Sequence, residues 1–500
     1  MYPTRGMESK SGNNPEESAY RETMKEVPVE KERIRTLGDA PHCPQPRYVL
    51  YWSQMNRRVS FNHALLHAVE LANLHGLPLL VYEGLTCTYK AANRRIHTFI
   101  LEGVPHTAAE LKRRGAGYFF YLRARRSEPN DLLYRLAAHA HTVVTDDYPV
   151  FIAAQHNQSV ASRIETPFVA VDSSCIVPMS VHEKQAWAAY TIRPKIQREL
   201  PRFLRAPDKT SLRHKWREDL LPADVVALRT AVTAEAIPKL VGTCEIDQSV
   251  PVSSAFHGGA EEASRRLELF LENNLLRYAA EGNKPSAHAT SNLSSHLHFG
   301  HISSLEIALA VQEYAEQHSL MAGEFLEQLT VRRELAFNFA RFSASPESFA
   351  SLPDWARRTM EKHAGDPRPF LYSPEQFEKA DTHDPLWNAA QKELLLRGII
   401  HGYYRMYWAK KIIEWSPNYE EALQLMIRLH DVYALDGRDP NTYTNILWCF
   451  GLHDRPWVER PVFGQLRYMS FDGMKRKTDI NAYVREIALL ELNGQDPYRI

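Results

Sequence analysis

Three tryptophans, Trp387, Trp408 and Trp415, follow one another at spacings of 21 and 7 residues in a stretch with helical periodicity. On helices these spacings return to a similar face, so the three rings could approach one another. Rings that lie this close could pass an electron along the series. Aromatic side chains on helices more often simply pack in a core, and spacing alone favours that interpretation over an electron-hopping chain.

Two polar segments could hold a ligand. The first, Ser291-Asn292-Leu293-Ser294, precedes a short helical pattern. It could cap that helix through a hydroxyl group, or it could bind a phosphate through its backbone N–H groups. An ordinary N-cap is the simpler of the two interpretations. The second segment, Leu435 to Asn441, is a turn rich in carboxylates and glycine. It is either a solvated loop or a polar floor beneath a heterocyclic ligand.

Basic and aromatic residues alternate in the segment from Trp448 to Lys477. Basic side chains neutralise phosphates, and aromatic faces can stack on unpaired bases. A basic surface over buried aromatics is an equally good interpretation, so the segment indicates nucleic-acid binding only as one of two alternatives. The basic residues are Arg455, Arg460, Arg467, Lys475, Arg476 and Lys477, and the aromatic ones are Trp457, Phe463, Tyr468 and Phe471.

Several common chemistries find no motif in the sequence. The chain has 22 histidines but no HExxH or similar ligand spacing, so we expect no metal site. Neither a GxSxG elbow nor a P-loop occurs, and no GxGxxG follows the first predicted strand. The five cysteines are scattered without a CxxC pair, which fits a reducing compartment. Sixty basic residues balance sixty acidic ones, so net charge favours no class of partner.

Apolar runs and helical patterns alternate in the first part of the chain and predict a Rossmann-like parallel α/β sheet. The predicted strands lie near residues 48–52, 78–82, 118–122, 142–145 and 168–171. After Gly259 helical periodicity dominates and predicts an all-α domain. We therefore expect a flexible tail over 1–45, an α/β domain over 46–180, a proline-rich and partly helical connector over 181–258, and a helical domain over 259–500.

No stretch of about eighteen apolar residues indicates a membrane span. The N-terminal residues are polar and mixed in charge, without the apolar run of a secretory signal. We expect a cytoplasmic monomer that does not associate with membranes.

Taken together, these segments resemble the class II cyclobutane pyrimidine dimer photolyases of the photolyase/cryptochrome family, from about residue 46 to the C-terminus. The resemblance rests on an ordered series of motifs. They are Ala189 to Ile196, Ser291 to Ser294 with Leu297 to Gly300, Val331 to Leu335, His383 to Ala390, Arg405 to Lys411, Asp436 to Asn441, and Glu459 to Gly464 with Arg467 to Met469.

The resemblance implies an N-terminal antenna domain, a C-terminal domain that binds FAD, and light-driven repair of UV-damaged DNA. It places Tyr278 and Ser291, Asn292, Leu293 and Ser294 at the FAD phosphates, and Arg405 and Asp436 around the flavin. It assigns Trp387, Trp408 and Trp415 to a tryptophan chain that re-reduces the flavin under light. It implies contacts with the lesion or its strand for Asn283, Met406, Trp448, Arg455, Trp457 and Arg467, and Lys475 belongs to the same basic segment.

Several positions depart from the family pattern. His430 stands where the class II enzymes usually carry an Asn near the flavin; His could still donate a hydrogen bond, with a charge that depends on pH. Gln328 replaces an acidic residue that contacts the dimer, and it cannot supply a carboxylic proton. Gly282 replaces an Arg, Thr442 replaces a Gly, and one residue is missing between Trp448 and Trp457. These departures concern the lesion more than the flavin.

Three other functions stay open at this point. A cryptochrome-like blue-light receptor is favoured by His430 and Gln328 and opposed by four retained residues, Trp448, Trp457, Arg455 and Arg467. A photolyase for another UV lesion would use His430 as an acid near its substrate. A helical DNA-binding protein without a cofactor fits poorly with the two retained polar segments. The sequence does not identify an antenna chromophore, which could be a deazaflavin, a folate or nothing.

Overall fold

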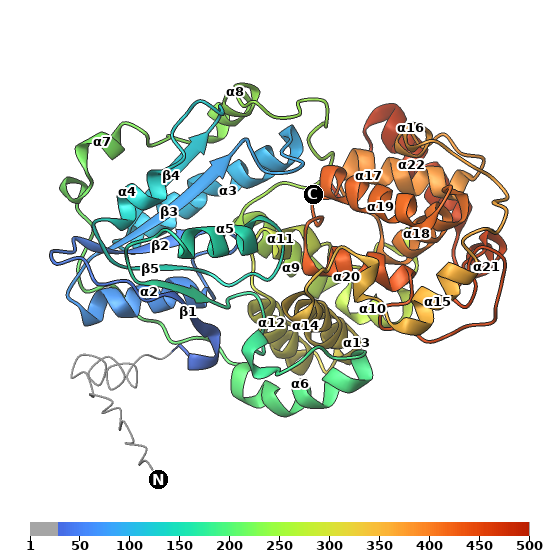
Figure 1. Cartoon of the computed structure of the whole chain (residues 1–500), viewed down its shortest axis with the longest axis horizontal. Helices are drawn as coiled ribbons and strands as arrows, with labels where there is room; N and C mark the ends of the chain where they lie inside the picture. The colour runs from blue at the N-terminus through green and yellow to red at the C-terminus, as the bar shows by residue number, and fades with distance from the viewer. Residues whose placement is uncertain (1–28, 500) are drawn as a thin grey trace, which may run out of the picture.

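The computed structural model describes residues 29–499, which form a sheet-containing region followed by a mostly helical one (Figure 1). The sheet has six strands in the order β1-β6-β5-β2-β3-β4. Its strands are β1 (Ile34–Gly38), β2 (Tyr48–Ser53), β3 (Leu79–Thr86), β4 (Gly117–Arg123), β5 (Ala140–Asp146) and β6 (Phe168–Val171). The five strands from β2 to β6 pair in parallel. This arrangement confirms the predicted α/β sheet.

The central strands are apolar because both faces of the sheet are covered. Every residue of β2 is buried, and one face of the sheet packs under α2 (His63–Leu74). Helices α3 (Arg94–Arg113), α4 (Leu132–Ala137) and α5 (Phe151–Ala161) follow strands β3, β4 and β5. Continuous Val, Leu and Tyr runs are typical of parallel strands that are buried on both faces.

The predicted flexible tail is wrong for its last part. Residues 1–28 lie outside the described residues, but Ile34–Gly38 forms strand β1, antiparallel to β6 at the edge of the sheet. Arg33, just before this strand, is buried and donates hydrogen bonds to the carbonyls of Asp172, Cys175 and Ile176 at 3.2, 2.9 and 2.8 Å. Backbone pairing and a satisfied guanidinium order a segment whose charged composition resembles a tail.

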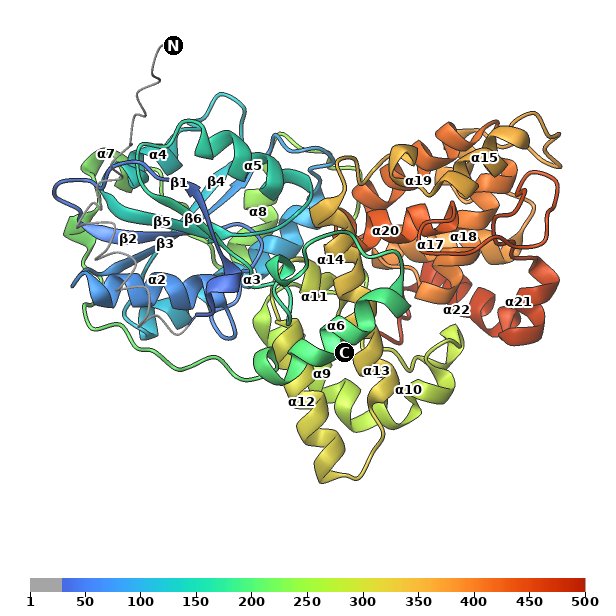
Figure 2. The ribbon, with the colours of Figure 1, turned by 60° about the horizontal axis from the view of Figure 1, so that its bottom comes forward.

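The expected connector, residues 181–258, contains helices α6 (Ala189–Phe203), α7 (Ala223–Val226) and α8 (Ile237–Gly242). Helix α6 lies against the helical region, next to a π-helical turn, Glu327–Arg332, between α13 (Gly323–Leu326) and α14 (Arg333–Phe342) (Figure 2). Arg193 of α6 and Glu327 of this turn form an ion pair of 2.7 Å. The connector therefore touches the helices that carry the family motifs.

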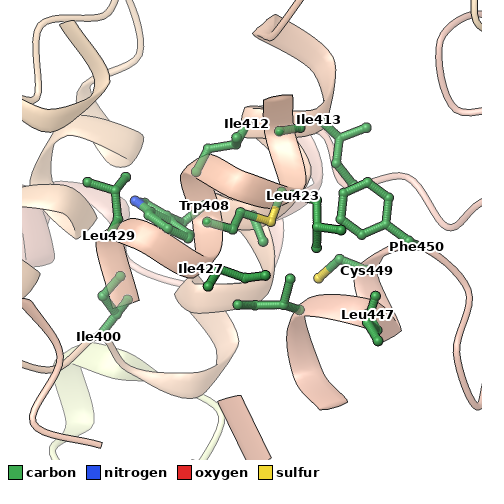
Figure 3. Packing of buried hydrophobic residues seen from close by; sticks show 14 of the residues in the cluster. Ile400, Trp408, Ile412, Ile413, Leu423, Ile427, Leu429, Leu447, Cys449 and Phe450 are labelled. Atoms are coloured by element: carbon green, nitrogen blue, oxygen red, sulfur yellow. The ribbon is translucent and has the colours of Figure 1, made fainter. Parts of the chain in front are cut away.

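The helical region confirms the predicted all-α part. Its other helices are α9 (Ala260–Asn273), α10 (Leu275–Glu281), α11 (Ser294–His298), α12 (Ser304–Gln317), α15 (Asp354–Lys362), α16 (Pro374–Glu378), α17 (Pro385–Arg397), α18 (Gly402–Trp415), α19 (Tyr419–Tyr433), α20 (Pro440–Cys449), α21 (Phe471–Lys477) and α22 (Ile480–Asn493). Figure 3 shows part of the core, where Trp408 of α18 packs with Leu429 and Ile427 of α19. The aliphatic residues of α18, α19 and α20 fill the space between these helices.

The helical pattern from Trp387 to Trp415 is interrupted. Helix α17 ends at Arg397, where Gly398 adopts a φ of +81°, a left-handed conformation that favours glycine. Helix α18 starts at Gly402 with His401 as its N-cap, whose ring accepts a hydrogen bond from the Tyr403 N–H. The two helices fold back on each other as a hairpin, and this reversal decides where the tryptophans meet.

One buried arginine of the first region ties the two regions together. Arg95 of α3 donates to the carbonyls of Leu394 in α17 and Tyr433 in α19 at 2.9 and 2.6 Å. The Tyr148 hydroxyl, which follows β5, donates to Asp439 before α20 at 2.7 Å.

Within residues 29–499, no helix combines the length and hydropathy that a membrane crossing requires.

Candidate functional site

A cavity of about 660 Å³ opens in the helical region. Its size is that of a site for a large organic ligand. Segments from α10, the π-helical turn, α18, α19 and α20 line it. Thirteen of the predicted site residues lie in its wall: Tyr278, Asn283, Ser291, Asn292, Leu293, Ser294, Gln328, Arg405, Met406, His430, Asp436, Trp448 and Arg467. Segments that are far apart in the chain thus meet at one place.

An ion pair forms the polar part of the cavity wall. Arg405 of α18 donates from Nη2 to both carboxylate oxygens of Asp436, at 3.1 and 2.9 Å. Burial raises the pKa of Asp436, but the Arg405 charge and hydrogen bonds, with the Ser294 hydroxyl, hold it below its usual range. Arg405 Nε is buried and has no partner among the described residues. A buried donor without a partner indicates that a ligand supplies the acceptor.

His430 offers the cavity a hydrogen-bond acceptor, whereas the sequence also allowed a donor there. Its Nδ1 lies 2.9 Å from the Met426 carbonyl, and a carbonyl can only accept, so Nδ1 carries the proton. Burial, assisted by the Arg405 charge, lowers the pKa of His430 to about 4. The ring is therefore neutral at pH 7, and its Nε2 presents a lone pair. The expected pH-dependent charge is absent in the neutral range.

We expect the fold to lose stability in mild acid. Burial lowers the pKa of His430 and His401 to about 4, and that of His296 to about 3, from an ordinary value of 6.5. The unfolded chain binds these protons as the pH falls below 6.5, whereas the folded protein does not until about pH 4. At pH 5 each of these histidines should cost about 2 kcal/mol of unfolding free energy relative to pH 7.

Urea unfolding at pH 7 and pH 5 checks this prediction. His430→Asn removes one of the titrating groups, so its loss of stability between the two pH values should be smaller than that of the native chain by about 2 kcal/mol. An equal loss in both proteins would contradict the assignment of a neutral buried ring to His430.

The N-cap interpretation of the hydroxyl-rich segment is wrong. Helix α11 begins at Ser294, Leu293 occupies the N-cap position, and no side chain caps the helix. Ser291 and Ser294 instead line the cavity, and Asn292 adopts a φ of +54°. Phosphate binding by this segment, the second interpretation, stays a prediction.

The π-helical turn Glu327–Arg332 carries the predicted site residue Gln328 and one residue, Arg332, to which the sequence analysis gave no role. Gln328 and Arg332 line the cavity, whereas Glu327 points to Arg193. The Arg332 guanidinium lies 5.6 Å from the Trp448 ring centroid. π-Helical turns often occur at functional sites because the extra residue re-aims neighbouring side chains. Two adjacent arginines, Arg332 and Arg333, before an apolar helix were the signal in the sequence.

The three tryptophans form a continuous series behind the cavity. The Trp408 ring meets the His430 ring edge-on at 5.1 Å between centroids, and His430 lines the cavity. Trp387 stacks on Trp408 at 6.2 Å with an interplanar angle of 4°, and it meets Trp415 at 6.2 Å. All three rings are buried. The order from the cavity outward is therefore Trp408, Trp387 and Trp415.

Hydrogen bonds fix the first two rings of this series. Trp387 Nε1 donates to the Trp408 carbonyl at 3.0 Å, and Trp408 Nε1 donates to Gln391 Oε1 at 2.9 Å. Asp384 accepts from the backbone N–H of Leu386 and Trp387 and so caps α17. Each of these two rings is thus held by a hydrogen bond to the opposite helix of the hairpin.

Outside the cavity mouth, one exposed tryptophan lies between two arginines. The guanidinium carbons of Arg455 and Arg467 are 5.5 and 5.2 Å from the Trp457 ring centroid. Arg467 also lines the cavity, whereas Arg455 and Trp457 are exposed beyond it. Lys475 lies on α21 and does not line the cavity. The basic and aromatic residues therefore gather at the mouth, with Lys475 set apart.

Two of the departures from the family pattern have local explanations. A Cβ at Gly282 would lie 2.7 Å from the Tyr278 carbonyl oxygen, so a side chain there needs a backbone shift. The Thr442 hydroxyl donates to the Asp436 carbonyl at 2.8 Å and so holds the end of the turn. Both residues fit the surroundings of the cavity in this chain.

The five cysteines are all free, and four of them are buried. In the part of the chain that the structure describes, no three His, Cys, Asp or Glu side chains converge as metal ligands would. The polar side chains of the cavity carry hydroxyl, amide, guanidinium, carboxylate and imidazole groups.

The chain is similar in sequence to known proteins over most of its length. The family model for DNA photolyase matches residues 49–213. A deoxyribodipyrimidine photo-lyase of Methanothermobacter thermautotrophicus is 39% identical over 460 residues, which cover 92% of this chain and 98% of that protein. The chain belongs to the DNA photolyase family. A second relative of the same name, from Potorous tridactylus, is 36% identical to this photolyase-family chain over 92% of its length and 85% of the relative's.

Solved structures confirm the photolyase fold. A cryptochrome of Synechocystis superposes with a TM-score of 0.65 at 16% identity, over 91% of both chains. A class III photolyase of Agrobacterium tumefaciens gives a TM-score of 0.61 at 16% identity, over 89% of this chain and 88% of that one. At this identity the likeness concerns the fold alone.

Proposed function

We propose that this chain is a deoxyribodipyrimidine photolyase that repairs cyclobutane pyrimidine dimers in DNA under blue light. The observation that carries the proposal is the cavity in which the separate family motifs meet, with a tryptophan series leading away from it. The relatives that bear this enzyme name match nearly the whole chain. Assignment to class II rests on the sequence motifs and stays a prediction.

FAD is the cofactor that the cavity fits. The Ser291 and Ser294 hydroxyls and Asn292 would hold its phosphates, and Tyr278 would pack beside them. Arg405 and Asp436 would face its polar heterocycle, and the unpaired Arg405 Nε supports an acceptor at that position. FAD supplies, when bound and reduced, the light-promoted electron that splits the cyclobutane ring and then returns. Neutral His430 would accept a hydrogen bond from a ligand N–H.

The protein's own residues conduct the electron that keeps the cofactor reduced. Trp408 lies next to the cavity residue His430, and each further ring is 6.2 Å from the one before it. The path runs through a buried core, so water does not reach the first three rings. Gln328 and Met406 in the cavity wall would face the damaged bases, and Gln328 can donate or accept hydrogen bonds there.

UV-damaged DNA is the proposed macromolecular partner. A dimer that has left the helix stack could enter the cavity, because its pairing is already weakened. Arg455, Trp457 and Arg467 stand at the mouth, where the arginines would neutralise phosphates and the indole would stack on an unpaired base. Asn283 and Trp448 line the same cavity.

One assay tests the proposed function. The purified chain is mixed with an oligonucleotide that contains a thymine dimer and with a reductant, and is kept in blue light or in the dark. We expect dimer loss in the light only. A yellow protein that photoreduces its flavin and leaves dimers intact would favour a cryptochrome-like receptor. A protein that stays colourless after incubation with FAD would exclude both functions.

Arg455→Ala should weaken binding to damaged DNA through the loss of one phosphate contact. We expect the slope of log K against log salt concentration to fall in magnitude by about one, with affinity lowered for damaged and undamaged DNA alike. Fluorescence anisotropy over a series of salt concentrations measures both quantities. Arg113→Ala, on α3 and paired with Glu110, removes an exposed arginine of the first region and is the control. Equal slopes for the native protein and Arg455→Ala would remove Arg455 from the interface.

A further inference from the structure

The tryptophan series continues past Trp415 to a tyrosine and a histidine at the surface. The Tyr372 ring meets the Trp415 ring edge-on at 5.7 Å between centroids, and the Tyr372 N–H donates to the Trp415 carbonyl at 3.3 Å. The His383 ring lies 4.9 Å from the Trp415 ring. Tyr372 is half-buried and His383 is exposed, so the aromatic contacts run from the cavity to solvent.

The phenol of Tyr372 is hydrogen-bonded to a base. Its hydroxyl lies 2.5 Å from Nδ1 of His383, and the hydroxyl oxygen accepts the His383 backbone N–H at 3.1 Å. The backbone bond occupies the oxygen as an acceptor, so the phenol is oriented to donate its proton to the imidazole. Phe370 stacks on the His383 ring at 4.0 Å and fixes its orientation.

Oxidation of a phenol is easier when its proton can leave with the electron, because the product is then a neutral radical. The surroundings of Trp415, in contrast, disfavour oxidation of its ring. The Lys411 ammonium lies 5.5 Å from its ring centroid, and a nearby positive charge disfavours a tryptophan radical cation. Glu414 pairs with Lys411 at 2.5 Å and offsets part of this charge. Both features favour movement of the positive charge from Trp415 to the Tyr372–His383 pair.

We propose that Tyr372 is the terminal electron donor of the tryptophan series and that His383 accepts its phenolic proton. The proposal rests on the proposed function, because the light-excited flavin acts as the oxidant through Trp408 and Trp387. One electron passes from Tyr372 to the Trp415 radical cation and restores neutral Trp415. The Tyr372 O–H bond breaks, and an N–H bond forms at Nδ1 of His383. A neutral tyrosyl radical and an imidazolium result.

This pair would prevent the electron from returning. The imidazolium is exposed and can pass a proton to water, and the radical lies at the surface, where an external reductant can reach it. Tyr372→Phe should therefore leave the radical on tryptophan and shorten its lifetime by about a factor of ten or more, since each 1.4 kcal/mol of lost stabilisation is tenfold in rate. His383→Asn should slow tyrosyl formation and remove its solvent isotope effect.

Time-resolved absorption and electron paramagnetic resonance after a light flash, in H2O and D2O, test the proposal on the FAD-loaded protein. The control is Tyr433→Phe, because Tyr433 also donates to a base, Glu378, but makes no ring contact with the tryptophans among the described residues. We expect a tyrosyl signal in the native protein and in this control, and its loss in Tyr372→Phe. In the flavin-free protein, nuclear magnetic resonance should show the His383 ring signals shift in Tyr372→Phe.

The possible failures are distinct. A long-lived tryptophan radical in the native protein, with normal flavin photoreduction, would overturn this proposal alone. A tyrosyl signal that is unchanged in His383→Asn would overturn the role of His383. A chain that takes up no flavin would overturn both the proposed function and this inference.

Discussion

Trp387→Phe is expected to slow photoreduction of the bound flavin by a factor of ten or more, while repair by chemically reduced protein stays near the native rate. An increase of only about 1.4 kcal/mol in the activation free energy of an electron-transfer step slows that step about tenfold. The repair electron leaves the cofactor toward the cavity and does not use the tryptophan series. The two readouts should therefore separate in this variant.

The size of the effect follows from the hairpin of α17 and α18. Trp408 and Trp415 belong to the same helix and are seven residues apart, a rise of about 10 Å along the helix axis. Trp387 comes from the other helix and stands 6.2 Å from each of them. Phenylalanine is much harder to oxidise than tryptophan, so its presence converts two short steps into one long step.

The substitution could also slow photoreduction by disturbing the fold, and a control variant tests for this effect. Trp387→Phe also removes the hydrogen bond to the Trp408 carbonyl, which should cost about 1 kcal/mol of unfolding free energy. Trp355→Phe, a partly buried tryptophan on α15 that packs against the same core, is the matched control. Photoreduction should be native-like in this control. Unchanged photoreduction in Trp387→Phe would remove Trp387 from the path.

Arg405→Ala is expected to raise the dissociation constant for FAD by about thirtyfold or more. Truncation of one partner of a buried, hydrogen-bonded charge pair costs at least about 2 kcal/mol, because the other charge stays buried without its partner. Here the remaining charge is the Asp436 carboxylate, which would face an anionic ligand. Fluorescence titration of the flavin-free protein with FAD measures the constant.

The double variant Arg405→Ala with Asp436→Asn tests whether the charge of the ion pair or the shape of the cavity governs FAD binding. It removes the unpaired carboxylate, so it should bind FAD more tightly than Arg405→Ala does, though more weakly than the native protein. Arg428→Ala, in an exposed pair with Glu378, should leave the dissociation constant unchanged. Equal affinity of the single and double variants would show that the cavity shape, and not the ion pair, governs binding.

Strand β1 shows where sequence patterns misled. Residues 1–45 are mostly charged and polar, a composition typical of a tail. Yet β1 needs few apolar side chains, because it pairs its backbone with β6 at the sheet edge and Arg33 is satisfied by carbonyls from distant loops. These partners lie more than 130 residues away in the chain, so no local pattern could reveal them.

His430 shows the same limit for chemistry. Its residue type allowed a donor, an acceptor or a charge. Nδ1 donates to the Met426 carbonyl, and burial keeps the ring neutral, so Nε2 is left as a hydrogen-bond acceptor. Both conditions come from the packing of α19 against its neighbours.

The sequence by itself determined the alternation of strands and helices, the change to an all-α half, and the set of segments that carry the family's chemistry. Local patterns suffice there, because burial on both faces demands apolar strands and a helix demands its own periodicity. The meeting of the tryptophans was decided by the tertiary structure. In one continuous helix Trp387 and Trp408 would stand about 30 Å apart, and only the reversal at Gly398 stacks them, since side-chain contacts depend on how helices pack.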